Sequence, residues 1–274
     1  MCIVTGMKDT LHRLAPTLRR GLLLPCILGV LAITLTAAPD AHAGRRPFIW
    51  VWDTEVLHER DVEMEQWIWE RKKKDQHAAW LWWAPVIGVT DRLELAIPLE
   101  GVTTWGKKTG AAAGDPDTWQ TGTRIARYGV ELRWRLAEND PEEAGPFVPL
   151  IRVAVKRRLG NELAWLLEGN LVGSLDFGDV HAALDLGAFH GIGGSAGTWL
   201  TYASGLTYGK QDGLRVGAEL FGEVGLSKGW KSFLMVGPNV AWTHGRTWLT
   251  FGCLIGTTEH AADWMPRLLW AIKL

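Results

Sequence analysis

Residues 92–100 read RLELAIPLE, and residues 127–136 read RYGVELRWRL. In both stretches apolar side chains alternate with charged ones, so that an extended strand has one apolar face and one ionised face. A soluble two-sheet protein would bury the apolar face under a second sheet. Here the charged face is as regular as the apolar face, and this regularity needs its own explanation.

The 274-residue chain also contains 17 Trp residues, which gather toward the ends of such alternating segments. A sheet closed on itself in lipid accounts for both features, because apolar side chains then face the hydrocarbon and charged ones face a shared interior. A soluble lipocalin-like barrel or sandwich is the alternative. The sequence predicts an all-β fold, a transmembrane antiparallel β-barrel of about 12 strands preceded by a signal peptide.

The first part of the chain has the pattern of a cleaved export signal. Basic residues are followed by an apolar run at residues 21–35, and Ala41 and Ala43 form a small-x-small cleavage site. An uncleaved membrane anchor is the alternative, which Pro25 and the cleavage site disfavour. We expect three parts: a signal peptide at 1–43, a periplasmic lead-in at 44–60 and an outer-membrane barrel at 61–274.

Charge and cysteine content argue against several classes of function. The chain has 29 Lys and Arg and 30 Asp and Glu, so its formal net charge of −1 gives no electrostatic case for a nucleic-acid partner. After signal removal Cys253 would be the single cysteine, too few for an intramolecular disulfide or a cysteine metal cluster. The eight His residues lack metal-ligand spacing. We therefore expect no metal and no other cofactor.

Twelve alternating segments fit the mature chain, and single-chain barrels have an even number of strands. Short connections alternate with longer ones, as periplasmic turns and outer loops do, although residues 137–145 break this rule and leave ten or fourteen strands open. The last segment is apolar and alternating, so it can pair with the first and leave no edge in the hydrocarbon. The expected strands are residues 61–70, 77–87, 92–100, 124–136, 147–156, 163–177, 180–190, 198–208, 214–224, 233–242, 247–257 and 266–274.

Five short motifs resemble those of known outer-membrane barrels. They are TEVLHERDVEMEQWIW at 54–69, GVTDRLELAIPLE at 88–100, YGVELRWRL at 128–136, GLRVGAELFGE at 213–223 and GPNVAW at 237–242. On these motifs the chain resembles bacterial outer-membrane barrels grouped as transporters, including the family named for the MetA pathway of phenol degradation. The resemblance covers most of the mature chain. It implies an outer-membrane location and solute passage, with no catalytic residues to carry over.

The charged faces of the expected strands would form the inner wall of the barrel. One interpretation is a channel lining that selects solutes, as rings of charge do in pores. The other is that neighbouring Arg and Glu pair and simply fill the interior, since isolated buried charges are costly. The predicted lumen-lining residues are Arg92, Glu94, Arg127, Glu131, Arg133, Arg152, Lys156, Glu168, Asp185, Arg215, Glu219 and Glu223.

The Trp residues also have two interpretations. Rings near strand ends suit interfacial girdles, where an indole buries its ring and keeps its N–H in water, and we favour this interpretation. The alternative is a path of inward rings that stacks sugars. Trp67 and Trp69 are its best candidates, because they share a face with Glu63 and Glu65.

We expect a narrow channel or transporter for small polar or aromatic solutes, since twelve strands fall between the filled eight-strand barrel and the open porin. A structural barrel with a plugged, salt-bridged lumen and no transport is the alternative. An outer-membrane hydrolase would need His181, Asp185, His190 or Ser195, but His181 and Asp185 are roughly 13 Å apart along a strand, so we expect no enzyme. The expected partners are outer-membrane lipid and lipopolysaccharide, the barrel assembly machinery and a small solute.

Overall fold

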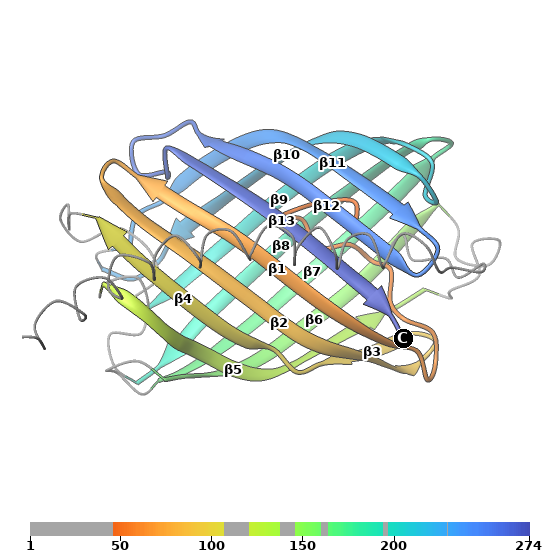
Figure 1. Cartoon of the computed structure of the whole chain (residues 1–274), viewed down its shortest axis with the longest axis horizontal. Helices are drawn as coiled ribbons and strands as arrows, with labels where there is room; N and C mark the ends of the chain where they lie inside the picture. The colour runs from red at the N-terminus through yellow and green to blue at the C-terminus, as the bar shows by residue number, and fades with distance from the viewer. Residues whose placement is uncertain (1–45, 107–120, 138–145, 160–163, 194–196, 229) are drawn as a thin grey trace, which may run out of the picture. The chain divides into compact units, whose positions relative to one another are not determined.

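The computed structural model describes residues 46–106, 121–137, 146–159, 164–193, 197–228 and 230–274. In this part of the chain, strand segments are joined edge to edge into one antiparallel sheet that closes on itself (Figure 1). The strands are β1 (Val62–Lys73), β2 (Gln76–Thr90), β3 (Leu93–Ala96), β4 (Leu99–Gly106), β5 (Gly122–Arg135), β6 (Phe147–Arg158), β7 (Trp165–Phe177), β8 (Val180–Ile192), β9 (Thr198–Gly209), β10 (Leu214–Gly225), β11 (Phe233–His244), β12 (Thr247–Gly256) and β13 (Trp264–Lys273).

The barrel is closed by pairing of the first and last strands. β1 pairs with β2 on one side and with β13 on the other, with Glu63 opposite Lys273 and Trp69 opposite Arg267. The N–H of Leu274, at the end of the chain, donates to the carbonyl of Val62 at 2.8 Å. The expected closure by the terminal strand is confirmed.

β3 and β4 are two parts of one crossing of the barrel. Both pair with β2 and β5, and the break between them falls at Ile97 and Pro98. Proline has no backbone N–H and cannot donate to a ladder, so a break at this position is expected. With β3 and β4 counted together, the described strands form the predicted twelve-stranded barrel, and the third expected strand is interrupted.

One end of the barrel carries the C-terminus and the short turns after β2, β7 and β11, and we call it the turn end (Figure 1). The opposite end, which carries the connections after β4, β6, β8, β10 and β12, is the loop end. Most of the irregular connection 137–145 lies outside the described residues. No helix in the described ranges is long and apolar enough to cross a membrane.

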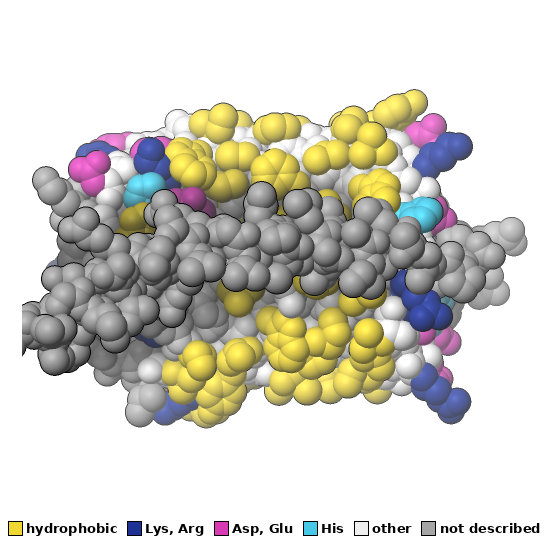
Figure 2. Space-filling view, viewed as in Figure 1, with side chains coloured by type: hydrophobic (Ala, Val, Ile, Leu, Met, Phe, Trp, Pro, Cys, Tyr) yellow, Lys and Arg dark blue, Asp and Glu magenta, His cyan; other side chains and the backbone are white. Residues whose placement is uncertain are grey.

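The outer face of the barrel is apolar. Leu93 pairs with Trp134 and Leu95 with Leu132, and all four side chains point outward; Leu132 and Trp134 expose 44% and 52% of their surface. Figure 2 shows hydrophobic side chains over the middle of the barrel, with charged side chains toward both ends. This belt fits a sheet whose outer face meets hydrocarbon.

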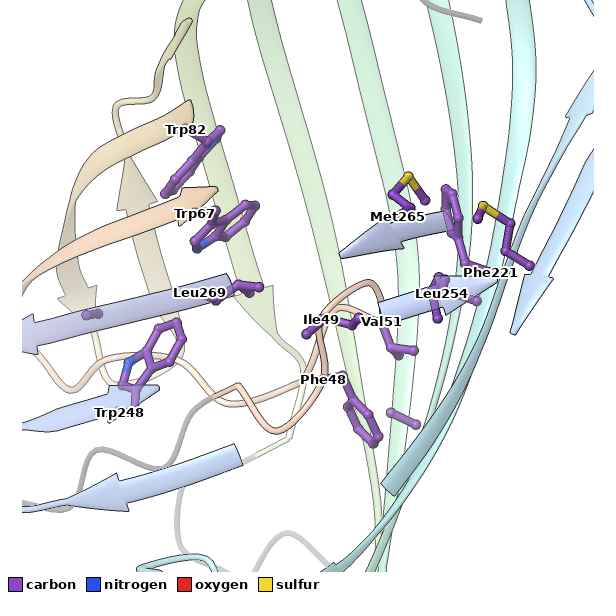
Figure 3. Packing of buried hydrophobic residues seen from close by; sticks show 14 of the residues in the cluster. Phe48, Ile49, Val51, Trp67, Trp82, Phe221, Trp248, Leu254, Met265 and Leu269 are labelled. Atoms are coloured by element: carbon purple, nitrogen blue, oxygen red, sulfur yellow. The ribbon is translucent and has the colours of Figure 1, made fainter. Parts of the chain in front are cut away.

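Residues 46–60, which we call the lumen segment, run inside the barrel as far as Leu57 (Figure 3), whereas His58, Glu59 and Arg60 are exposed at the turn end. Phe48, Ile49, Val51 and Leu57 are each at most 5% exposed and pack with inward side chains of the strands. The segment enters at the turn end, where the N–H of Arg60 donates to a carbonyl of β2. In the described part of the segment expected as a periplasmic lead-in, the apolar side chains are therefore buried against the inner wall.

Candidate functional site

A ladder of ion pairs runs along the inner wall from β3 to β7. Arg133 Nη1 lies 2.6 Å from Glu94 Oε1, and Arg133 Nε lies 2.5 Å from Glu131 Oε1. Arg152 Nη2 then lies 2.5 Å from Glu131 Oε2 and 2.6 Å from Glu168 Oε2. Each carboxylate is shared between neighbouring cations, which is the arrangement that buried charges require.

The ladder continues toward the loop end. Lys156 Nζ lies 3.0 Å from Glu168 Oε1 and 2.7 Å from Glu100 Oε1. Arg127 Nη1 lies 3.6 Å from the other oxygen of Glu100. The register explains these contacts, because Glu100 stands opposite Arg127 across β4 and β5, just as Glu94 stands opposite Arg133 across β3 and β5.

The lumen segment joins this ladder through Arg46. Arg46 Nε lies 3.3 Å from Glu65 Oε1, and its Nη2 lies 3.7 Å from Glu94 Oε1. Arg133 Nη1 also lies 3.3 Å from Glu65 Oε1. A cation of the segment thus contacts the same carboxylates as a cation of the wall.

The backbone of the lumen segment is held by carboxylates of the wall. Glu219 on β10 accepts the N–H groups of Ile49, Trp50 and Val51 at 2.6, 2.7 and 3.1 Å. Its Oε1 also accepts from Asn239 Nδ2 at 2.5 Å. Three consecutive N–H groups aimed at one anion form a small anion site, which compensates the buried negative charge. The charge of Glu219 therefore fixes the inner bend of the segment.

The second half of the lumen segment, which includes Asp53 and Thr54, has polar contacts of its own with the wall. His181 Nε2 lies 3.1 Å from both carboxylate oxygens of Asp53, and His181 Nδ1 lies 2.7 Å from Asp176 Oδ1. The hydroxyl groups of Thr54 and Ser174 are 2.5 Å apart. Burial raises the pKa of Asp53, but the charge and hydrogen bond of His181 lower it more, so this pKa lies below its ordinary value of 3.8. Asp53 is therefore ionised at neutral pH.

A cavity of about 200 Å³ lies between the lumen segment and the loop end of the barrel. Trp50 and Trp52 of the segment form its floor. The wall is partly charged and partly aromatic. The charged side chains that line it are Arg71, Glu100, Arg127, Arg152, Lys156, Glu168, Asp185, Glu223 and Arg267. The other aromatic ones are Trp67, Trp69, Trp80, Trp82, Phe189, Trp199, Phe221, Trp230 and Phe233.

The aromatic side chains of the cavity are stacked in pairs. Trp67 and Trp82 stack at 3.9 Å between ring centroids, and Trp69 and Trp80 stack at 5.6 Å with their planes 3° apart. These four Trp residues point inward, so the girdle interpretation is wrong for them. It is also wrong for Trp248, which is buried beside the lumen segment (Figure 3). The alternative had named Trp67 and Trp69 as inward, and that placement is correct.

No family model matches the chain, and no curated protein matches it. The chain is similar in structure to an outer membrane channel from Pseudomonas putida F1, with a TM-score of 0.54 at 13% identity over 81% of this chain and 98% of that chain. The chain has the fold of an outer-membrane β-barrel. The NanC porin has a TM-score of 0.49 at 9% identity over 77% of this chain and 100% of that one. The KdgM porin in complex with disordered oligogalacturonate has 0.48 at 11%, over 78% and 99%.

Most of the predicted lumen-lining residues lie on the inner face of this barrel. Arg92 differs, because it is exposed in the turn between β2 and β3. The inward-facing predicted residues are Glu94, Arg127, Glu131, Arg133, Arg152, Lys156, Glu168, Asp185, Arg215, Glu219 and Glu223.

The residues considered for a hydrolase have other surroundings. His181 contacts Asp53 of the lumen segment, and Asp185 Oδ2 accepts the N–H of Trp52 at 3.4 Å. His190 Nδ1 lies 2.8 Å from the hydroxyl of Thr198. Ser195 lies outside the described residues. The contacts of His181 and Asp185 therefore hold the lumen segment inside the barrel.

Sequence reasoning missed the lumen segment as part of the site. The signal was present in FIWVWD at residues 48–53, where apolar and aromatic residues follow the cation Arg46. In the structure Arg46 lies over the rings of Trp52 and Trp67, at 4.7 and 5.6 Å from their centroids. An aromatic segment ahead of the first strand of an outer-membrane barrel is thus a pointer to an occupied lumen.

Proposed function

We propose that the protein is an outer-membrane channel for small solutes, in which the lumen segment is a displaceable constriction. The observation that carries this proposal is how the segment is bound. From Ile49 to Trp52 and at Leu57, its described N–H contacts to the wall go to the side chains of Glu219, Asp185 and Glu94. At the turn end, where the segment leads into β1, the N–H of Arg60 donates to the backbone carbonyl of Gly88. The strands themselves pair with one another around the whole barrel. The segment can therefore leave the wall without opening the sheet.

The inner wall supports passage of polar solutes once the segment has moved. Its charges are already compensated by one another in the ladder from Glu94 to Arg127, and only Arg46 is contributed by the segment. Displacement of the segment leaves the charges of the ladder paired with one another and hydrated, so none of them becomes an isolated charge in a dry interior. Charged side chains that line a narrow point determine which solutes pass in selective pores.

The outer surface supports the proposed location and partners. The apolar belt supports an outer-membrane location, with lipid and lipopolysaccharide around it. β13 ends in an apolar alternating stretch, which supports recognition by the barrel assembly machinery. The resemblance to transporters of the phenol-degradation type, together with the aromatic cavity, supports small polar or aromatic molecules as the solutes.

A reversible covalent lock tests the proposal. The hydroxyl oxygens of Thr54 and Ser174 are 2.5 Å apart, so cysteines at these positions would bring two sulfur atoms near the bonding distance of about 2 Å. We would combine Thr54→Cys and Ser174→Cys with Cys253→Ser, since Cys253 is the one cysteine among the described residues. Purified protein would then be measured in planar bilayers, oxidised and after reduction.

We expect unitary conductance from the reduced protein and an at least tenfold lower conductance from the oxidised protein. The control is Thr54→Cys alone on the same background, whose conductance should not depend on the redox state. Equal conductance of the oxidised and reduced double variant would show that the segment does not control passage. Absence of conductance from the reduced protein at every voltage and salt concentration would contradict the channel itself.

A further inference from the structure

We propose that Arg267 and the Trp rings around it form a binding site for the carboxylate of a small aromatic monoanion of the benzoate class. The inference rests on the proposed function only in taking this ligand as the solute that enters the lumen. The site lies where β13 meets β1, with Arg267 directly opposite Trp69. It forms part of the cavity above the lumen segment.

The guanidinium group of Arg267 is enclosed by aromatic rings. Its Cζ lies 4.2 Å from the ring centroid of Trp50, 4.7 Å from that of Trp67 and 5.1 Å from that of Trp69. The residue is 7% exposed, so the group is removed from bulk water. A guanidinium over indole faces is stabilised by the ring quadrupoles, but the rings accept none of its in-plane N–H bonds in the way that a carboxylate does.

Arg267 differs from the other buried arginines in its partners. Arg133 and Arg152 each contact carboxylates at 2.6 Å or less. The guanidinium of Arg267 forms no hydrogen bond or ion pair with any side chain in the described part of the chain, and its buried Nε has no acceptor. Glu219 attracts it electrostatically, but the oxygens of Glu219 are occupied by three backbone N–H groups and Asn239. Arg267 therefore presents unfilled donors to the cavity.

The charge balance of the cavity matches a monoanion. Of the described side chains that line it, five are Arg or Lys and four are Asp or Glu, so at formal charges one positive charge is in excess. Lys156 and Arg127 contact Glu100, Arg152 contacts Glu168, and Arg71 interacts electrostatically with Glu223. Arg267 is the cation of this lining that has no carboxylate contact among the described residues. One carboxylate would complete the balance.

The space beside Arg267 favours a small planar ligand. A cavity of about 200 Å³ holds roughly the volume of six or seven water molecules at about 30 Å³ each, enough for one substituted ring. Its walls are flat indole faces, and an aromatic ring gains from stacking on them. A guanidinium presents two parallel N–H bonds that match the two oxygens of a carboxylate. The combination selects a ring with one carboxylate.

The test is calorimetric titration of the full-length protein in detergent with benzoate, benzamide and acetate. Benzamide keeps the ring and loses the charge, and acetate keeps the charge and loses the ring. We expect benzoate to bind at least tenfold more tightly than either. In Arg267→Gln we expect at least a tenfold loss of benzoate affinity, and loss of the preference over benzamide.

The matched control is Arg92→Gln, which removes the same charge from an exposed turn and should leave benzoate affinity unchanged. Heat-dependent gel migration would report folding of each variant. If Arg267→Gln does not fold, Arg267→Lys and the ligand series on the unaltered protein decide the matter. Lys keeps the charge, so its preference for benzoate over benzamide should persist with weaker binding.

Equal affinity of the unaltered protein for benzoate and benzamide would overturn the proposal. So would a folded Arg267→Gln variant that keeps the full preference for benzoate. Binding and conductance are measured separately. If either of these binding results is found while the reduced lock variant conducts normally, the ligand class is wrong and the proposed channel function is still supported. Benzoate binding by a protein that shows no conductance would support the ligand class and contradict the channel.

Discussion

At the scale of single residues, Glu219 is the clearest link between the wall and the lumen segment. A buried carboxylate without compensation is expensive, and here four N–H groups provide that compensation. Three of the four come from the segment. The state with the segment inside is thus favoured by the same charge that would be poorly satisfied without it.

We predict that Glu219→Gln loosens the lumen segment. The amide keeps the shape but loses the charge, and hydrogen bonds to a charged group contribute about 1.5–3 kcal/mol. Maleimide labelling of Thr54→Cys on the Cys253→Ser background, at a position 2% exposed in the structure, should then become roughly 10- to 150-fold faster. Glu223→Gln on the same strand is the control, and an equal effect of both variants would count against a specific anchor.

The inward faces of most charged residues could be predicted from the sequence, because period-two alternation assigns a side chain to one face. The faces of Trp67 and Trp69 followed from the same rule, since they alternate in step with Glu63 and Glu65. The girdle interpretation relied on the general enrichment of Trp at membrane interfaces instead of on this alternation. For Trp67 and Trp69 that interpretation was wrong. Partners such as Arg152 and Glu168 needed the register between strands, which the sequence does not state.

At the scale of elements, the strands were predictable and the lumen segment was not. Most strand ends agree within a few residues, as in β8, which was expected at 180–190 and spans Val180–Ile192. The third strand is an exception, because it was expected to end at residue 100 and β4 continues to Gly106. The path of residues 46–60 depends on space made far away in the chain. A Cβ at Gly205 would meet Phe48 Cε1 at 2.4 Å, and one at Gly252 would meet Ile49 Cδ1 at 2.7 Å. Such complementarity appears only after the barrel has closed.

The entry of the lumen segment gives a prediction at this scale. A Cβ at Gly88 would lie 1.8 Å from the carbonyl oxygen of His58, so Gly88→Ala must push the segment away from β2. Overpacking of this kind costs about 1–3 kcal/mol. We expect faster labelling of Thr54→Cys, with the barrel still folded by heat-dependent gel migration.

Gly169→Ala on β7 is the matched control, because a Cβ there meets nothing within 4 Å. It should leave the labelling rate unchanged. A Gly88→Ala variant that labels no faster than the Gly169→Ala variant is incompatible with a tight entry at this point.

At the scale of the whole molecule, the apolar belt is the feature that makes the barrel a membrane protein. Leu171 lies in the middle of β7 and Phe177 at its turn end, and both point outward with more than half of their surface exposed. The cost of a cation on the lipid face depends on depth, about 2–4 kcal/mol at the midplane and about 0–1 near the interfaces.

We therefore predict that Leu171→Arg lowers the free energy of unfolding by about 2–4 kcal/mol, and Phe177→Arg by at most about 1 kcal/mol. Denaturant titration of protein folded into lipid vesicles measures both. Equal losses at the two positions would mean that this face does not cross a bilayer.

The lumen segment continues directly into β1, and this linkage makes the obstruction a tethered competitor. A ligand on a short flexible link meets its site at an effective concentration on the millimolar scale. An incoming solute therefore has to outcompete a partner that never diffuses away, and the passage recloses without any second component. Solute selectivity can then come from competition between the solute and the lumen segment for the same carboxylates and rings, as well as from the width of the pore.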